Sequence, residues 1–153
     1  MMMELKRILL VEDDPKDVQL TLEALSEYNL ANEVVVARDG EEALDYLHRR
    51  GKFQKVGNGN PAAILLDLKL PKVNGLEVLT QIRAEEKLKK IPVIVLTSSR
   101  QEEDLEKCYS LGVNAYVVKP VDFHEFINAV KELGAFWGLI NEPPPGSLRK
   151  GYK

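Results

Sequence analysis

The chain has 153 residues, of which 44% are hydrophobic and 29% are charged. This composition is typical of one ordinary globular domain, and it excludes a disordered or fibrous protein. The net charge of −3 disfavours a general nucleic-acid binder, and the single cysteine excludes both a disulfide framework and a cysteine zinc cluster.

The N-terminal segment lacks the pattern of an export signal. Glu4, Lys6 and Arg7 place charges where a signal peptide would need an apolar run. No uninterrupted apolar segment approaches roughly 18 residues, the length of a membrane-spanning helix. We therefore expect a cytoplasmic protein that binds neither membranes nor nucleic acids.

The first part of the chain alternates between strand and helix patterns. The apolar run 7–11 predicts a buried strand, and Asp14 followed by Pro15 is typical of a helix start. The β-branched run 33–37 predicts a second strand, and residues 39–42 resemble a capping box that opens a second helix.

A polar connection follows the second predicted helix. Residues 49–61 form a longer loop than is usual between a helix and a strand, and they include Arg49, Arg50, Lys52 and Lys55. Two interpretations stay open, a solvated loop and a contact with an acidic partner.

The rest of the chain continues the alternation. Ser99 with Glu102 resembles a second capping box, and Gly112 is typical of a residue that ends a helix. The expected elements are a strand at 64–66, a helix at 75–85, a strand at 92–97, a helix up to 111, a strand at 114–120 and a helix at 122–140.

Five strands alternating with five helices predict an α/β fold. We expect a doubly wound, five-stranded parallel sheet in the flavodoxin-like order 2-1-3-4-5, a (βα)5 arrangement. The predicted domain spans residues 1–141. Residues 142–153 are rich in proline and basic residues, and we expect them to be a disordered tail.

Asp67 is the residue around which the rest of the sequence is organised. It follows a buried apolar run, and the carboxyl end of such a strand opens into the crevice where α/β proteins place their chemistry. The order 2-1-3-4-5 brings Asp13 and Asp14 beside it, and three repelling carboxylates call for a cation. Oxygen ligands alone favour Mg²⁺. Taken alone, Asp67 could also simply begin a loop.

Two more side chains meet at the same edge of the predicted sheet. Thr97 ends the fourth strand and Lys119 ends the fifth, so that a hydroxyl and an ammonium join the three carboxylates. Such a set suits a phosphoryl group, with Asp67 as the nucleophile that forms an acyl phosphate.

The motifs together resemble the receiver domains of two-component response regulators. The matching pieces, in order, are Val11-Glu12-Asp13-Asp14, Leu66-Asp67 through Pro71 to Gly75, Thr97-Ser98 and Lys119-Pro120. The resemblance implies Asp67 as phosphoacceptor, with Asp14 as a direct and Asp13 as a water-mediated Mg²⁺ ligand. It also implies the backbone carbonyl of Lys69 as a ligand and Lys119 as the partner of the phosphoryl group.

The resemblance further implies how a signal would leave the site. Thr97 would turn toward the phosphoryl group and Tyr116 would move with it, although Tyr116 could equally be a half-buried edge aromatic. The Lys119-Pro120 peptide bond is expected to be cis. Glu12 is expected to be exposed and incidental.

The ends of the chain resemble the stand-alone response regulators of cyanobacterial phytochromes. The points of likeness are the basic loop 49–61 and Phe136-Trp137 in the last helix. A helix over 122–140 would run roughly 28 Å, beyond what a five-stranded sheet covers. Phe136, Trp137 and Ile140 would then form a homodimer or partner surface, unless they fold back onto their own domain.

The sequence therefore predicts a signalling protein rather than an enzyme, one that catalyses only its own phosphoryl transfer and autodephosphorylation. Its expected donor is a sensor histidine kinase, and the resemblance to the phytochrome response regulators points to a phytochrome as that kinase. Alternatives are a phosphorelay shuttle, a phosphate sink or a flavodoxin-like binding protein. A haloacid-dehalogenase-type phosphatase would need an Asp at the position of Lys69.

Overall fold

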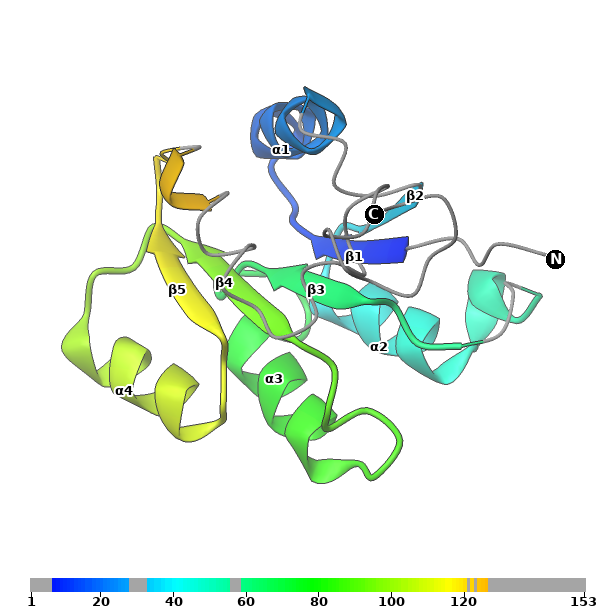
Figure 1. Ribbon diagram of the computed structural model, residues 1–153. Helices are drawn as coiled ribbons and strands as arrows, with labels where there is room; N and C mark the ends of the chain where they lie inside the picture. The colour runs from blue at the N-terminus through cyan, green and yellow to red at the C-terminus, as the bar shows by residue number, and fades with distance from the viewer. Residues whose placement is uncertain (1–6, 28–32, 56–58, 121, 123, 127–153) are drawn as a thin grey trace, which may run out of the picture.

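The fold is a parallel β-sheet with helices on both faces (Figure 1). The computed structural model describes residues 7–27, 33–55, 59–120, 122 and 124–126. Its five strands lie in the order β2-β1-β3-β4-β5, and all four strand pairs are parallel. The predicted α/β class and strand order are confirmed.

Strands and helices alternate along the described residues as the sequence predicts, with bounds that differ by one or two residues, except that the short helical turn η1 lies within the predicted loop 49–61. The strands are β1 Arg7–Val11, β2 Glu33–Ala37, β3 Ala63–Leu66, β4 Val93–Thr97 and β5 Ala115–Val118. The helices are α1 Pro15–Glu27, α2 Gly40–His48, η1 Gly51–Phe53, α3 Gly75–Ala84 and α4 Glu102–Ser110. Residues 124–126 are also helical.

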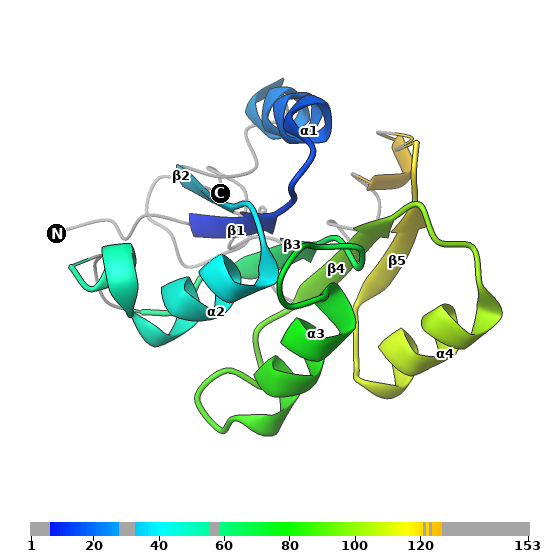
Figure 2. The same cartoon turned by 180° about the vertical axis from the view of Figure 1, so that it is seen from behind.

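The two faces of the sheet carry separate apolar cores. Leu9 and Val11 of β1 face a core that includes residues of α2 and α3, whereas Ile8 and Leu10 face a core that includes Val18 of α1. Figures 1 and 2 show the same division, with α1 on one side of the sheet and α2, α3 and α4 on the other. The central strands are buried on both faces, which explains their uninterrupted apolar runs.

Of the two capping boxes predicted before the second and fourth helices, the one at Asp39 is present and the one at Ser99 is not. The Asp39 carboxylate accepts a hydrogen bond from the Glu42 N–H at 2.7 Å, as a cap at the start of α2 should. The proposed capping box of Ser99 and Glu102 is wrong, because Gln101 is the N-cap of α4 and makes no side-chain cap. The Ser99 hydroxyl instead donates to Asp104 at 2.6 Å.

The basic segment after α2 folds back onto that helix. Phe53 of η1 packs edge-on against the buried ring of Tyr46, with the ring centroids 5.3 Å apart. Arg50 pairs with Asp45 at 3.3 Å, and Lys52 pairs with Glu42 at 2.9 Å. Both cations thus have carboxylate partners within the domain, and both side chains stay more than half exposed to solvent.

Several predictions concern residues outside the described ranges. These are most of the helix at 122–140, the surface of Phe136, Trp137 and Ile140, and the tail at 142–153. The start of that helix is described: the Asp122 carboxylate accepts a hydrogen bond from the Glu125 N–H at 3.2 Å. Among the described helices, none is long and apolar enough to cross a membrane.

Candidate phosphoryl-acceptor site

The candidate site lies where β1 and β3 end side by side. Val11 and Leu66 are paired across the two strands, so the residues that follow them, Glu12 and Asp67, emerge at the same edge of the sheet. The Asp67 N–H still donates to the Val11 carbonyl at 3.1 Å, which continues the ladder past the end of β3. The backbone therefore fixes where the Asp67 carboxylate begins.

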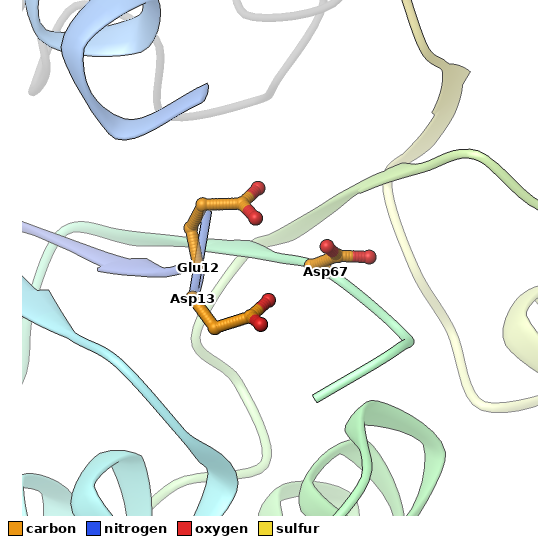
Figure 3. Close-up of side chains that lie close together, drawn as sticks. All are labelled: Glu12, Asp13 and Asp67. Carbon is orange, nitrogen blue, oxygen red and sulfur yellow. The ribbon is translucent and has the colours of Figure 1, made fainter. Parts of the chain in front are cut away.

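Three carboxylates converge at this edge. Glu12 and Asp13 come from the end of β1 and point toward Asp67 from β3 (Figure 3). One oxygen from each lies within 4.8 Å of the others. Glu12 and Asp67 are 2% and 6% exposed, whereas Asp13 faces solvent. The site is thus buried on one side and open on the other.

The expectation that Glu12 is exposed and incidental is wrong. Glu12 extends the ladder beyond β1, because its N–H donates to the Ala37 carbonyl at 2.9 Å, and this carries its side chain into the interior. Asp14, which the sequence suggested as a ligand, is exposed and lies outside the group of three. Its carboxylate accepts the Lys16 N–H at 2.8 Å and caps α1.

Lys119 closes the site from the end of β5. Its ammonium lies 2.7 Å from Glu12 Oε1, 2.9 Å from Asp17 Oδ2 and 3.0 Å from Asp67 Oδ2. An ammonium has three N–H donors, so these contacts use all of them. The predicted meeting of Lys119 with Asp67 is present in the structure.

The electrostatics of the site follow from burial and close charges. Burial raises the pKa of Glu12 to about 7, opposed by the hydrogen bond from Lys119 and reinforced by the Asp67 charge. Burial by itself would lower the pKa of Lys119, but hydrogen bonds to Glu12, Asp17 and Asp67 outweigh it and raise that pKa. Lys119 is therefore a permanent cation here.

Thr97 and Tyr116 are connected through Ser99. The fully buried Thr97 hydroxyl accepts the Ser99 N–H at 3.2 Å, and the Tyr116 hydroxyl donates to the Ser99 carbonyl at 3.1 Å. The Lys119 N–H donates to the Thr97 carbonyl at 2.8 Å. Tyr116 is half-buried on β5, so both interpretations of it remain compatible with its position.

The loop after Asp67 is folded tightly over the site. The Lys69 N–H donates to Asp67 Oδ1 at 3.2 Å, and the Gly75 N–H donates to the Leu68 carbonyl at 2.8 Å. A Cβ atom on Gly75 would lie 2.2 Å from the Asp67 carbonyl oxygen, so only glycine fits there. The Lys119-Pro120 peptide bond is cis, as expected.

Sequence reasoning missed two carboxylates, Glu12 and Asp17. A signal for Glu12 was available, because it directly follows the buried apolar run of β1, as Asp67 follows that of β3. Asp17 carried no comparable signal, since an acidic residue in the first turn of a helix is commonly a solvated one. Its contact with Lys119 depends on how α1 crosses the sheet.

Comparison with known proteins identifies the family. A family model described as the response regulator receiver domain matches residues 8–131. The chain belongs to this family. The receiver family assignment agrees with the resemblance found in the sequence motifs and with the observed sheet order.

Three response regulators or related regulatory proteins are similar to this chain over most of its length. The bacteriophytochrome response regulator RtBRR has a structure with a TM-score of 0.82 and 62% identity, covering 94% of this chain and 87% of its own. The phosphorylated cyanobacterial phytochrome response regulator RcpA has a TM-score of 0.74 and 42% identity, covering 88% of this chain and 94% of its own. The probable methanogenesis regulatory protein FilR2 of Methanothrix harundinacea (strain 6Ac) is 42% identical over 139 residues, 90% of this chain and 86% of FilR2.

Proposed function

We propose that this response regulator accepts a phosphoryl group on Asp67 from a sensor histidine kinase linked to a phytochrome. The observation that carries the proposal is the placement of the Asp67 carboxylate, between the Lys119 ammonium at 3.0 Å and the open side marked by Asp13. The likeness to RtBRR and to phosphorylated RcpA supports both the chemistry and the kind of donor.

Asp67 is the nucleophile of the proposed transfer. One carboxylate oxygen of Asp67 forms a bond to phosphorus while the bond from phosphorus to the donor nitrogen breaks, and the donor imidazole keeps the electron pair. The Lys69 N–H holds Oδ1 and Lys119 holds Oδ2, so the carboxylate is oriented before the donor arrives. Lys119 then pairs with the oxygens of the transferred group.

The donor set fits Mg²⁺. Glu12, Asp13 and Asp67 supply only oxygen ligands, and their three negative charges exceed the single positive charge of Lys119. The backbone carbonyl of Lys69 is a further proposed ligand. When bound, Mg²⁺ would supply charge neutralisation for the phosphoryl oxygens. Glu12 takes the place that the sequence analysis assigned to Asp14.

The proposed switch runs from Thr97 to Tyr116. A phosphoryl group on Asp67 adds negative charge and acceptor oxygens, to which the Thr97 hydroxyl would donate. This movement would withdraw the acceptor from the Ser99 N–H, and Ser99 in turn binds Tyr116 and Asp104. The change would thus reach α4 and β5.

We extend the proposal to the location, the output and the domain bounds of the protein. We place the protein in the cytoplasm, with output through altered protein contacts and a homodimer formed around Phe136, Trp137 and Ile140. The domain would span residues 1–141, with 142–153 as a tail. Phosphorelay shuttling and phosphate drainage would use the same site without a direct output.

Intact-mass measurement with a small phosphodonor tests this proposal. Incubation with acetyl phosphate should add one phosphoryl group in the presence of Mg²⁺ and none in its absence. Asp67→Asn should add none in either condition. Asp45→Asn is the matched control, because Asp45 pairs with Arg50 away from the site, and it should react like wild type. Equal uptake by Asp67→Asn would refute the assignment.

A further inference from the structure

The Asp17 carboxylate is the one partner of Lys119 that the proposed chemistry does not use. The Lys119 ammonium donates its three hydrogen bonds to Glu12, Asp17 and Asp67. Glu12 and Asp67 belong to the group of three carboxylates that fits a cation, whereas Asp17 lies outside that group. Its contact with Lys119 therefore needs its own explanation.

The Asp17 side chain that contacts Lys119 belongs to a capped helix. It lies in the first turn of α1, which begins at Pro15 and is capped by Asp14 through the Lys16 N–H. The Asp17–Lys119 pair joins residues 102 positions apart, at a distance of 2.9 Å. The Lys119 side chain is 15% exposed and that of Asp17 is 32% exposed, so the pair is partly shielded from water.

The other two partners of Lys119 must change during the proposed reaction. An Asp67 oxygen becomes bonded to phosphorus, and it then accepts hydrogen bonds less strongly than a free carboxylate does. A bound cation would compete with Lys119 for Glu12. Only the Asp17 carboxylate keeps its charge and its bond to the ammonium through both events.

We propose that Asp17 is a positioning residue for phosphoryl transfer, one that anchors the Lys119 ammonium in the site while its other partners are exchanged. This inference rests on the proposed function of Asp67. Asp17 lies outside the carboxylate group that contains Asp67, and it acts through Lys119.

Phosphorylation kinetics of the full chain test the inference. Asp17→Ala should lower the maximal rate of phosphoryl uptake from acetyl phosphate by about tenfold, because a mobile ammonium is poorly placed in the transition state. Its Mg²⁺ affinity, measured by titration calorimetry, should fall less than the uptake rate does, because Asp17 contributes no oxygen to the group of three carboxylates. Asp17→Glu, which restores a carboxylate, should recover part of the lost rate.

A matched control separates anchoring from a general charge effect. Glu23→Gln removes one negative charge from the same helix, where Glu23 pairs only with the exposed Gln19 in the described structure, and it should react like wild type. A pure charge effect predicts faster uptake of an anionic donor by Asp17→Ala. An unchanged or faster rate in that variant therefore overturns the inference.

The two hypotheses fail in different ways. If wild type takes up no phosphoryl group, the proposed function fails, and the role of Asp17 fails with it. If wild type reacts and Asp17→Ala reacts equally fast, only the inference about Asp17 fails. Should Asp17→Ala not fold, Asp17→Asn serves instead, since it keeps the shape and removes the charge, and its rate should also fall.

Discussion

The Nζ atom of Lys119 lies 3.0 Å from Oδ2 of Asp67, although 52 positions separate the two residues in the chain. Each follows the end of a parallel strand, and the order β1-β3-β4-β5 brings these ends to one edge of the sheet. This relationship places a permanent cation against the proposed nucleophile.

Glu12 and Asp14 are expected to differ in their importance for Mg²⁺. Glu12→Gln and Asp13→Asn should each weaken Mg²⁺ binding by about tenfold or more, because each removes a carboxylate from the group of three. Asp14→Asn should change the affinity less than about twofold, since its carboxylate caps α1 instead. Titration calorimetry would measure all three, and a large loss in Asp14→Asn would favour the ligand set suggested by the sequence.

Glu12 should make the stability of the metal-free protein depend on pH. Its pKa is raised from 4.5 to about 7 by burial, so the folded state holds the proton more tightly than the unfolded state does. Stability should therefore fall as pH rises from about 4.5 to about 7, by roughly 3 kcal/mol from this group.

Urea unfolding in the presence of a chelator would measure this dependence. Glu12→Gln is the comparison, because a neutral amide cannot titrate. The difference in unfolding free energy between wild type and Glu12→Gln should shift across this pH window. A difference that stays constant from pH 4.5 to pH 7 would show that the Glu12 pKa is not raised.

Gly75 should be intolerant of any side chain. Gly75→Ala would place a Cβ 2.2 Å from the Asp67 carbonyl oxygen and 2.5 Å from Leu68 Cα, so the loop carrying Asp67 must shift. We expect a loss of about 2 kcal/mol in urea unfolding, together with slower phosphoryl uptake. Thr80→Ala, on the exposed face of the same helix, should stay within about 0.5 kcal/mol of wild type. Equal stability of the two variants would contradict the close approach.

Cys108 should be inert in the folded protein. It is fully buried, and burial raises its pKa to about 11. At neutral pH its reaction with a disulfide-exchange thiol reagent should be at least about a hundredfold slower than in denaturant, because little thiolate is present. Cys108 is the single cysteine, so absorbance of the released thiolate reports on it alone. Rapid reaction of the native protein would mean that the core beside α4 opens readily.

Much of the site was predictable because its residues lie at the carboxyl ends of strands. Asp67 is conspicuous as a charge directly after the buried apolar run of β3. Thr97 ends the buried run of β4, and Lys119 directly follows the partly buried β5. The strand order then brings them together. This step needs only the strand order, which five alternating strands and helices limit to a few known arrangements.

The incorrect predictions concern side chains whose direction depends on tertiary contacts. Three consecutive acids follow β1, and only the continued ladder from Glu12 to Ala37 determines that Glu12 points inward while Asp14 caps α1. Ser99 has the sequence pattern of an N-cap, but its hydroxyl donates a hydrogen bond to Asp104, because α4 begins only at Glu102. Asp17 could not be placed without the path of α1 across the sheet.

The position of the acyl phosphate in the chain tests the proposed role of Asp67 most directly. Protein treated with acetyl phosphate and Mg²⁺ would be reduced with borohydride, which converts a phosphorylated aspartate to homoserine, and then digested and mapped by mass spectrometry. Homoserine is expected at Asp67 and at no other position. Homoserine at Asp13, Asp14 or another carboxylate, or its absence despite a gain in intact mass, would contradict it.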